Sequence, residues 1–218
     1  IEDQIAEFYA QAKTVLFLSI EGKLTGLMTI ADAVKSDSEK AIREIQQLGI
    51  NVVMLTGDNE FTAQSVAQRV GINQVIANVL PHNKSETISA LQKNSGTIAM
   101  VGDGINDAPA LALADIGFAI GTGTDVAIES ADVVLMRGSL LGVVDAINIS
   151  RQTVKNIKQN LFGAFIYNII GIPIAAGVLY PSFGILLNPM VAGGAMAMSS
   201  VTVVSNANRL RLLSRNLR

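Results

Sequence analysis

Two short loops carry most of the residues whose types and spacing could do chemistry. The first, Thr56-Gly57-Asp58-Asn59, directly follows an apolar run at residues 51–55. Its hydroxyl and backbone amides could hold a phosphate oxygen, aided by the start of the next helix. The same four residues also suit an ordinary turn followed by a helix cap, and the sequence alone leaves both interpretations open.

The second loop, Gly102-Asp103-Gly104-Ile105-Asn106-Asp107, follows the apolar run at 97–101. Two carboxylates placed four residues apart can share a hard cation, and Mg²⁺ is bound in this way beside phosphate groups. The two glycines allow close backbone approach. A turn that caps a helix would explain the glycines but not the density of carboxylates, so the pattern favours a magnesium site.

Between the two loops, Lys84 begins a predicted helix that connects the two strands. A lysine there can neutralise a phosphoryl oxygen, although taken singly it also fits a solvated side chain. His82, the only histidine, is expected to lie in a surface loop and not to bind a ligand. There is no cysteine, which excludes disulfides and thiolate metal sites within the chain.

The elements that must position these loops alternate between strand and helix. Apolar runs predict strands at 24–31, 51–55, 74–77, 97–101, 116–120 and 133–136, and helical patterns lie between them at 37–48, 60–70, 84–92, 107–114 and 125–130. This alternation predicts an α/β fold with a doubly wound parallel sheet. Ligands bind such sheets at the carboxyl ends of the strands, where both loops lie. A helix at 1–13 and a strand at 14–20 precede this region.

Charge divides the chain into two parts. Residues 159–208 contain no Asp, Glu, Lys or Arg. Residues 1–158 hold 12 of the 16 basic residues against all 18 acids, which argues against a nucleic-acid binder.

The uncharged stretch divides at Pro181–Gly184 and predicts a hairpin of two transmembrane helices, at about 160–180 and 185–207. A helix pattern at 140–158 leads into it. Lys155 and Lys158 before it, and four arginines after it, predict that both ends are cytoplasmic. A buried hairpin of a large soluble protein is the alternative, disfavoured because charge-free stretches of this length are rare in soluble folds.

Polar residues inside the expected spans, Tyr167-Asn168 and Met196-Ala197-Met198-Ser199-Ser200, suit either helix packing or a transport path. Thioether sulfur prefers soft ions such as Cu(I). Neither span contains the Asp, Glu or His that hard divalent ions favour.

Three motifs together resemble the P-type ATPases, whose phosphorylation domain has the haloacid dehalogenase-like fold. They are MLTGDN at Met54–Asn59, VLPHNK at Val79–Lys84 and VGDGINDAPAL at Val101–Leu111. The downstream segment Ile120–Leu135 resembles the heavy-metal members, and the polar residues of the two spans resemble the ion-site motifs of the copper(I)-exporting pumps. The resemblance covers nearly the whole chain.

The resemblance implies a set of catalytic residues. Thr56 and Gly57 would contact the phosphoryl group transferred from ATP, with Asp58 in the same loop. Lys84 would stabilise that group, and Asn106 would bond to it. Asp103 would bind Mg²⁺ with Asp107 supporting the site. Cu⁺, the transported ion, would be bound by Tyr167, Asn168, Met196 and Ser200. Ag⁺ is not distinguished from Cu⁺, whereas zinc, cadmium and lead pumps carry an intramembrane acidic residue that this chain lacks.

The resemblance also implies a domain organisation. Residues 1–24 would end the nucleotide-binding domain, and 25–148 would form the phosphorylation domain without its first strand, which leaves a central sheet edge open. Residues 149–218 would form a stalk helix, the hairpin and a basic tail. The implied partners are membrane lipid, the N-terminal parts of the same pump and a copper chaperone, in the plasma membrane of a bacterium or archaeon.

The family's phosphorylated aspartate lies in a D-K-T-G-T motif that does not occur here. We therefore expect a fragment that does not pump by itself. One alternative is a non-enzymatic membrane module that binds metal or regulates a pump. Others are a pump for another heavy metal and a soluble phosphatase of the same fold.

Overall fold

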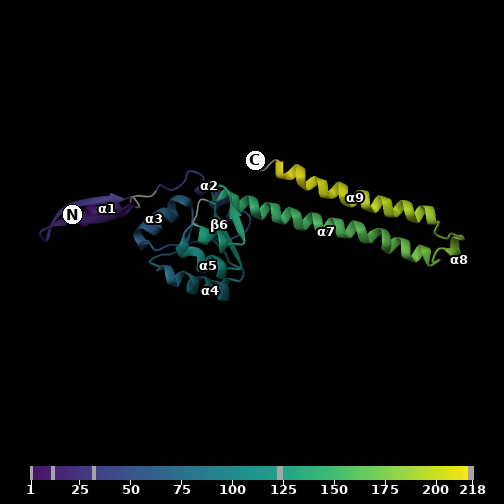
Figure 1. Ribbon diagram of the computed structural model, residues 1–218, viewed down its shortest axis with the longest axis horizontal. Helices are drawn as coiled ribbons and strands as arrows, with labels where there is room; N and C mark the ends of the chain where they lie inside the picture. The colour runs from purple at the N-terminus through teal and green to yellow at the C-terminus, as the bar shows by residue number, and fades with distance from the viewer. Residues whose placement is uncertain (1, 11–12, 31–32, 122–124, 216–218) are drawn as a thin grey trace. The chain divides into compact units, whose positions relative to one another are not determined.

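The computed structural model describes residues 2–10, 13–30, 33–121 and 125–215 of the 218. It divides into two compact units, residues 1–144 and 145–218. Figure 1 shows the helices and strands in chain order. Because the placement of the two units relative to one another is not determined, each unit is described by itself.

The first unit begins with a helix and a hairpin. Helix α1 spans Glu2–Ala10, and strands β1 (Thr14–Ile20) and β2 (Lys23–Ile30) pair antiparallel. The prediction that β2 belongs to the parallel sheet is wrong. Glu21 and Gly22, with φ of 50° and 76°, form a two-residue turn of the kind that joins consecutive antiparallel strands. The expected domain boundary at residue 24 therefore falls inside a strand that pairs with β1.

The predicted parallel strands form two sheets. Strand β3 (Val53–Leu55) pairs with β4 (Gln74–Ile76), and β6 (Ile116–Ile120) lies between β5 (Ala99–Gly102) and β7 (Val133–Leu135). Within the described ranges no ladder joins β3 to β5. The connecting helices are α2 (Ser38–Gln47), α3 (Glu60–Val70), α4 (Lys84–Ser95), α5 (Ala108–Leu113) and α6 (Asp125–Glu129), with short 3₁₀ helices η1 (Pro81–Asn83) and η2 (Ile105–Asp107).

Helices pack against both faces of strand β3, as the doubly wound prediction requires. Met54 packs on a cluster that includes Ile42 of α2 and Val70 of α3. Leu55, the next residue of β3, packs on a second cluster formed by α4, β5, α5 and α6, in which Leu111 is fully buried. Successive residues of a strand point to opposite faces, so the two clusters lie on opposite sides of β3.

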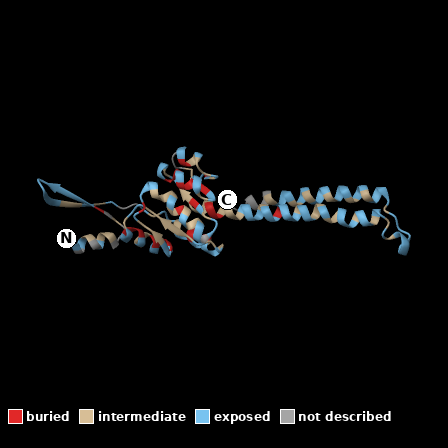
Figure 2. Ribbon diagram, turned by 90° about the horizontal axis from the view of Figure 1, so that it is seen from below, coloured by how far each residue is buried: buried red, intermediate tan, exposed pale blue. Residues whose placement is uncertain are grey.

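The second unit is built from long helices. Helix α7 spans Leu141–Ala175, beginning just before the unit boundary, α8 spans Tyr180–Phe183, and α9 spans Pro189–Arg215. Figure 1 shows α7 and α9 running side by side. In Figure 2 most of their residues are exposed or intermediate, whereas the buried residues gather in the α/β unit. The helix expected at 140–158 continues without a break into the uncharged stretch, because α7 extends from Leu141 to Ala175.

The bounds of the expected spans differ from the prediction. Helix α7 ends at Ala175, beyond Pro173 and just before Gly177, whose φ is 83°. The helical part of the expected first span therefore covers 16 residues (160–175), about 24 Å against a hydrocarbon core of about 30 Å. Among the described residues, one helix segment is long and apolar enough to cross a membrane, Pro189–Leu210, with 22 residues and a mean hydropathy of 1.2.

Asparagine side chains join the middle of α7 to the C-terminal part of α9. Asn156, which is buried, donates to the backbone carbonyl of Asn206 at 2.7 Å. Asn206 donates to Oδ1 of Asn160 at 2.9 Å, and Asn160 donates to Oδ1 of Asn156 at 3.0 Å. Because each residue both donates and accepts, with Asn206 accepting through its backbone carbonyl, these three residues form a closed polar network between the two helices.

Candidate functional site

The Thr56–Asp58 loop is held in place by hydrogen bonds at both of its ends. The backbone amide of Thr56 donates to Ile76 at 3.0 Å, and the amide of Val79 donates back to Thr56 at 3.0 Å. Thr56 Oγ1 donates to Asp58 Oδ2 at 3.0 Å and accepts from the Asp58 amide at 3.1 Å. The loop is therefore fixed to the chain that leads from β4 into η1, and its hydroxyl is oriented by Asp58.

The helix-cap interpretation of the same loop is confirmed. Asn59 is the N-cap of α3, and its Oδ1 accepts from the amide of Thr62 at 3.0 Å. Capping satisfies an amide that has no partner inside the helix. Since the cap uses Asn59, it leaves Thr56 and Gly57 available for a phosphoryl group.

Lys84 and Asp107 form an ion pair that joins the second and third motifs. The Lys84 ammonium lies 2.6 Å from Asp107 Oδ1, and the two side chains are 16% and 12% exposed. Gly104 donates its backbone amide to Asp107 Oδ2 at 3.3 Å. Asp107 is thus occupied on both oxygens, which suits the supporting role expected for it better than direct coordination of a cation.

Gly102 is required by the close approach of Asp107. A Cβ atom at residue 102 would lie 2.7 Å from the Asp107 Cβ, nearer than carbon atoms can approach. The glycine before Asp103 therefore makes room for the aspartate that pairs with Lys84. This is the tight backbone approach that the sequence predicts.

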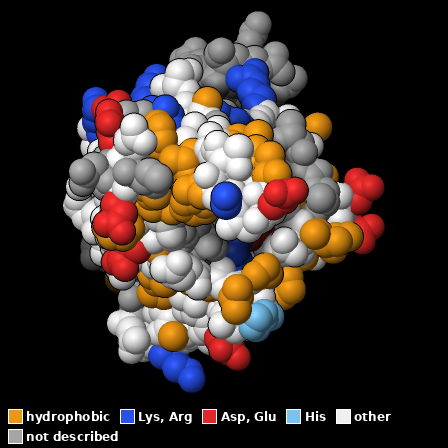
Figure 3. All heavy atoms as spheres, turned by 90° about the vertical axis from the view of Figure 1, so that its left-hand side faces the viewer, with side chains coloured by type: hydrophobic (Ala, Val, Ile, Leu, Met, Phe, Trp, Pro, Cys, Tyr) orange, Lys and Arg blue, Asp and Glu red, His pale blue; other side chains and the backbone are white. Residues whose placement is uncertain are grey.

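Asp103 and Asn106 lie at the rim of the same loop with exposed side chains. The described part of the chain provides no hydrogen-bond or ion-pair partner for the Asp103 carboxylate. Asp103 follows β5 directly, so its carboxylate lies at the carboxyl end of a parallel strand, where such sheets bind ligands. His82 is exposed, as expected, but it belongs to η1 and not to a loop (Figure 3, pale blue).

Asp115 is a structural carboxylate that the sequence patterns do not indicate. It lies just before β6, at the opposite end of the strand from the candidate site. The backbone amide of Ile98 donates to it at 2.8 Å and Gln92 at 3.2 Å, and these bonds lower the pKa of Asp115 below its ordinary value. Its role is to tie the ends of α4, β5 and β6 together.

The four residues expected to bind the transported ion lie on α7 and α9. Asn168 donates to the carbonyl of Ala164, and Ser200 donates to the carbonyl of Met196, so both bond to their own helix. The Met196 side chain is 71% exposed, and Tyr167 is half-buried. Among the described residues no hydrogen bond joins the side chains of any two of the four. No group of three or more His, Cys, Asp or Glu side chains that could hold a metal occurs there either.

Comparison with known proteins identifies the family of the α/β unit. Residues 1–115 match the haloacid dehalogenase-like hydrolases. The chain belongs to this family. The fold and the three motifs agree with that membership, because each motif follows or adjoins a carboxyl end of a parallel strand.

Curated relatives extend the similarity to nearly the whole chain. A copper-exporting P-type ATPase of Vibrio cholerae is 59% identical over 210 residues, which cover 96% of this chain and 23% of that protein. A silver-exporting P-type ATPase of Salmonella typhimurium is 52% identical and covers 92% of this chain and 24% of that protein. The predicted resemblance to the P-type ATPases is therefore confirmed. The chain spans about a quarter of the length of these relatives.

A solved structure has a similar fold. The crystal structure of a zinc-transporting PIB-type ATPase in the E2.Pi state matches with a TM-score of 0.78 and 35% identity, covering 96% of this chain and 33% of that one. The likeness therefore extends over both the α/β unit and the long helices.

Proposed function

We propose that this chain is the phosphoryl-transfer and ion-path segment of an ATP-driven pump that exports Cu⁺ or Ag⁺. The observation that carries the proposal is the identity of 52–59% to copper- and silver-exporting P-type ATPases over more than nine-tenths of the chain. The likeness to the zinc-transporting pump is lower, at 35% identity. The absence of Asp, Glu and His from residues 159–208 also favours a soft monovalent ion over Zn²⁺.

The geometry of the α/β unit supports phosphoryl transfer. Thr56 and Gly57 lie in a loop that hydrogen bonds hold at the end of β3, where they would contact the phosphoryl oxygens. Lys84 is held near the site by Asp107, and Asn106 lies exposed on η2 beside it. Fixed cationic and polar groups stabilise the charge that develops on a transferred phosphoryl group. The aspartate that accepts the group would lie in sequence that is not part of this chain.

The residues at the second loop fit Mg²⁺. The donor there is the exposed Asp103 carboxylate, and Mg²⁺ takes oxygen ligands of this kind together with substrate phosphates. Asp107 would act indirectly, because Lys84 and the Gly104 amide already occupy its oxygens. When bound, Mg²⁺ would offset negative charge on the phosphoryl oxygens.

Helices α7 and α9 would carry the transported ion. Met196 offers a thioether and Tyr167, Asn168 and Ser200 offer oxygen ligands, a set suited to a soft ion. The membrane location rests on the apolar segment Pro189–Leu210 and on the charge-free stretch, with both ends cytoplasmic because Lys155 and Lys158 precede it and arginines follow it. Membrane lipid, the remaining domains of the pump and a copper chaperone would be its partners, in a bacterial or archaeal plasma membrane.

The test is ATPase activity of the intact natural protein in lipid under reducing conditions, with Cu⁺, Ag⁺, Zn²⁺ and Cd²⁺ added in turn. We expect stimulation by Cu⁺ and Ag⁺ only. Stimulation by Zn²⁺ or Cd²⁺ would preserve the P-type assignment and overturn the ion assignment. Asp103→Ala is expected to abolish the phosphorylated intermediate, and a normal level of that intermediate would overturn the magnesium role of Asp103.

A further inference from the structure

The last third of the chain has an unbalanced charge. Asp145 is the last acidic residue, and seven Lys or Arg follow it without a single Asp or Glu. Three of the seven lie on α7 within two turns, at residues 151, 155 and 158, immediately before the charge-free stretch begins.

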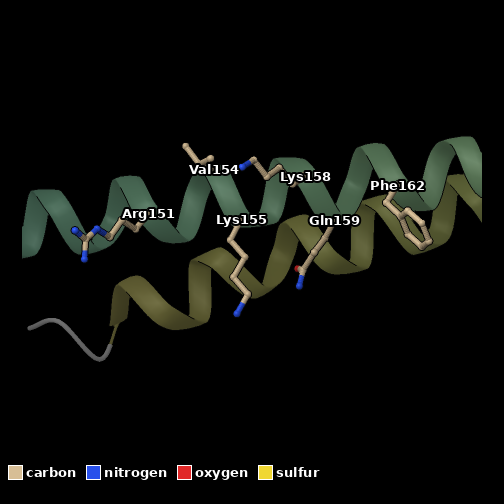
Figure 4. A pocket seen from close by; sticks show the side chains of 6 residues that line it. All are labelled: Arg151, Val154, Lys155, Lys158, Gln159 and Phe162. Carbon is tan, nitrogen blue, oxygen red and sulfur yellow. The ribbon is translucent and has the colours of Figure 1, made fainter. Parts of the chain in front are cut away.

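An open groove of about 500 Å³ runs along this part of α7. Its lining residues recur at helical spacing on one face of the helix, and they are Arg151, Val154, Lys155, Lys158, Gln159 and Phe162. Figure 4 shows Arg151 and Phe162 at its two ends. The groove is thus cationic over most of its length and apolar at the end that meets the charge-free stretch.

Helix α9 adds a fourth cation beside this groove. Lys155 and Gln159 also line a neighbouring hollow together with Asn206 and Arg209 of α9. In Figure 4 the Lys155 and Gln159 side chains extend toward α9. The Asn156–Asn160–Asn206 network fixes the two helices at this level, so the cations of α7 and α9 are held at a set spacing.

An apolar stripe continues from the groove along α7. Phe162 is 68% exposed, and exposed apolar side chains follow it at helical spacing, namely Phe165, Ile169 and Ile172. A surface with cations at one end and a long apolar stripe at the other matches the chemistry of an anionic phospholipid. The phosphate would meet the cations and an acyl chain would follow the stripe.

We propose that the groove lined by Lys155, Lys158 and Gln159, with Arg209 of α9 beside it, is a binding site for the headgroup of an anionic phospholipid. Its acyl chain lies along Phe162 and the apolar residues that follow. The lipid holds the basic segments of α7 and α9 together at the membrane surface. This inference rests on the membrane location given under the proposed function, but it does not depend on which ion is transported.

The experiment measures binding of phosphatidylglycerol and phosphatidylcholine to the intact natural protein in detergent by native mass spectrometry. We expect phosphatidylglycerol to bind more tightly. Each cation near an anionic lipid contributes about five-fold in binding, so Lys155→Gln with Lys158→Gln should reduce the preference by roughly 25-fold. The matched control, Lys23→Gln with Lys93→Gln, removes the same charge from exposed positions of the first unit and should leave the preference unchanged.

Two further variants separate the parts of the site. Lys155→Arg with Lys158→Arg keeps the charge and should keep the preference for phosphatidylglycerol. This variant shows whether a loss in the glutamine variant comes from the missing charge or from misfolding. Phe162→Gln should weaken both lipids equally, because it removes a contact with the acyl chain and not with the headgroup.

Three outcomes would overturn the proposal: equal binding of the two lipids by the unmodified protein, an equal loss in the control variant, or displacement of phosphatidylglycerol by glycerol phosphate alone. The last outcome would identify a site for free phosphate. If the protein prefers phosphatidylglycerol but Cu⁺ and Ag⁺ do not stimulate its ATPase activity, the lipid site stands. The proposal that the protein transports Cu⁺ or Ag⁺ is then overturned.

Discussion

The two units of the chain hold their candidate residues in different ways. In the α/β unit, side chains from separate motifs contact one another. Lys84, at the start of α4, lies 2.6 Å from Asp107, at the end of η2. On α7 and α9, Asn168 and Ser200 donate to carbonyls of their own helices. Contacts between motifs therefore position Lys84 and Asp107, whereas Asn168 and Ser200 are oriented by their own helices.

The difference has a physical reason. A parallel sheet brings the carboxyl ends of its strands to one edge. Loops that are far apart in the sequence therefore lie close together there. Two helices that run side by side present to each other only one narrow face each. On α7 and α9 that face is used by Asn156, Asn160 and Asn206, and Met196 lies away from it with 71% exposure.

The largest expected effect comes from breaking the ion pair of the first unit. Lys84→Met leaves the buried Asp107 carboxylate without its cation, which should cost about 3 kcal/mol of folding free energy. The phosphorylated intermediate of the intact protein should also be lost. Thermal unfolding by calorimetry and a phosphorylation assay measure the two effects.

A double variant separates the two roles of this lysine. Lys84→Met with Asp107→Asn removes the unpaired charge and should recover part of the stability without recovering phosphorylation. Recovery of both would mean that Lys84 acts only through its contact with Asp107. Equal stability of Lys84→Met and the unmodified protein would contradict a tight ion pair.

The second-largest effect is expected at the proposed ion site of the second unit. Met196→Ala should reduce stimulation of the ATPase by Cu⁺ at least about ten-fold, because it removes a soft ligand. Stability should change by less than about 0.5 kcal/mol, since the side chain is mostly exposed. Met190→Ala is the matched control, because Met190 is 85% exposed on the same helix. If both variants lose Cu⁺ stimulation to a similar extent, Met196 is not a specific ligand of the ion.

A smaller effect is expected from the network that joins α7 to α9. Asn206→Ala removes one amide that bonds to Asn160 and should destabilise the helix pair by about 1 kcal/mol. Asn208→Ala, at an exposed position two residues on, should have no measurable effect. Hydrogen exchange of α7 and α9 in the intact protein compares the two variants, and equal protection in both would show that the network is dispensable.

The smallest effect concerns Asp115. Its pKa is lowered in the folded state by the Ile98 amide and Gln92, so its contribution to stability is present above the unfolded pKa of about 3.9. That contribution is lost as the pH falls through the folded pKa, which lies below this value. Asp115→Asn should therefore speed hydrogen exchange around Ile98 at pH 7, relative to the unmodified protein, and the difference should shrink at pH 3. A difference that stays constant with pH would exclude the ionised carboxylate as its cause.

Local signals made some elements predictable and failed for others. Helix α3 has the predicted bounds, because Asn59 caps its start and Gly71, with φ of 80°, ends it. Strand β2 was assigned to the wrong sheet because strand pairing is a non-local property, although the Glu21-Gly22 turn contained the signal for a hairpin. The first apolar span was predicted too long because Pro173 and Gly177 end α7 within an otherwise uniform run.

The same division applies to the candidate site. The motifs predicted its residues, because phosphate chemistry requires hydroxyl, carboxylate and ammonium groups at the ends of strands. They did not predict that Asp107 pairs with Lys84 and leaves Asp103 as the exposed carboxylate. Asp115 escaped notice because an aspartate before a strand has no distinctive pattern.

The sequence by itself determined the order of the elements, the doubly wound fold, the family and the residues able to do chemistry. These follow from periodicity and from motifs, which are local along the chain. Only the tertiary structure decided which carboxylate is occupied, which strand joins which sheet and which face of α7 meets α9. Those depend on contacts between residues far apart in sequence, and the free energy of such contacts is set by packing and burial in three dimensions.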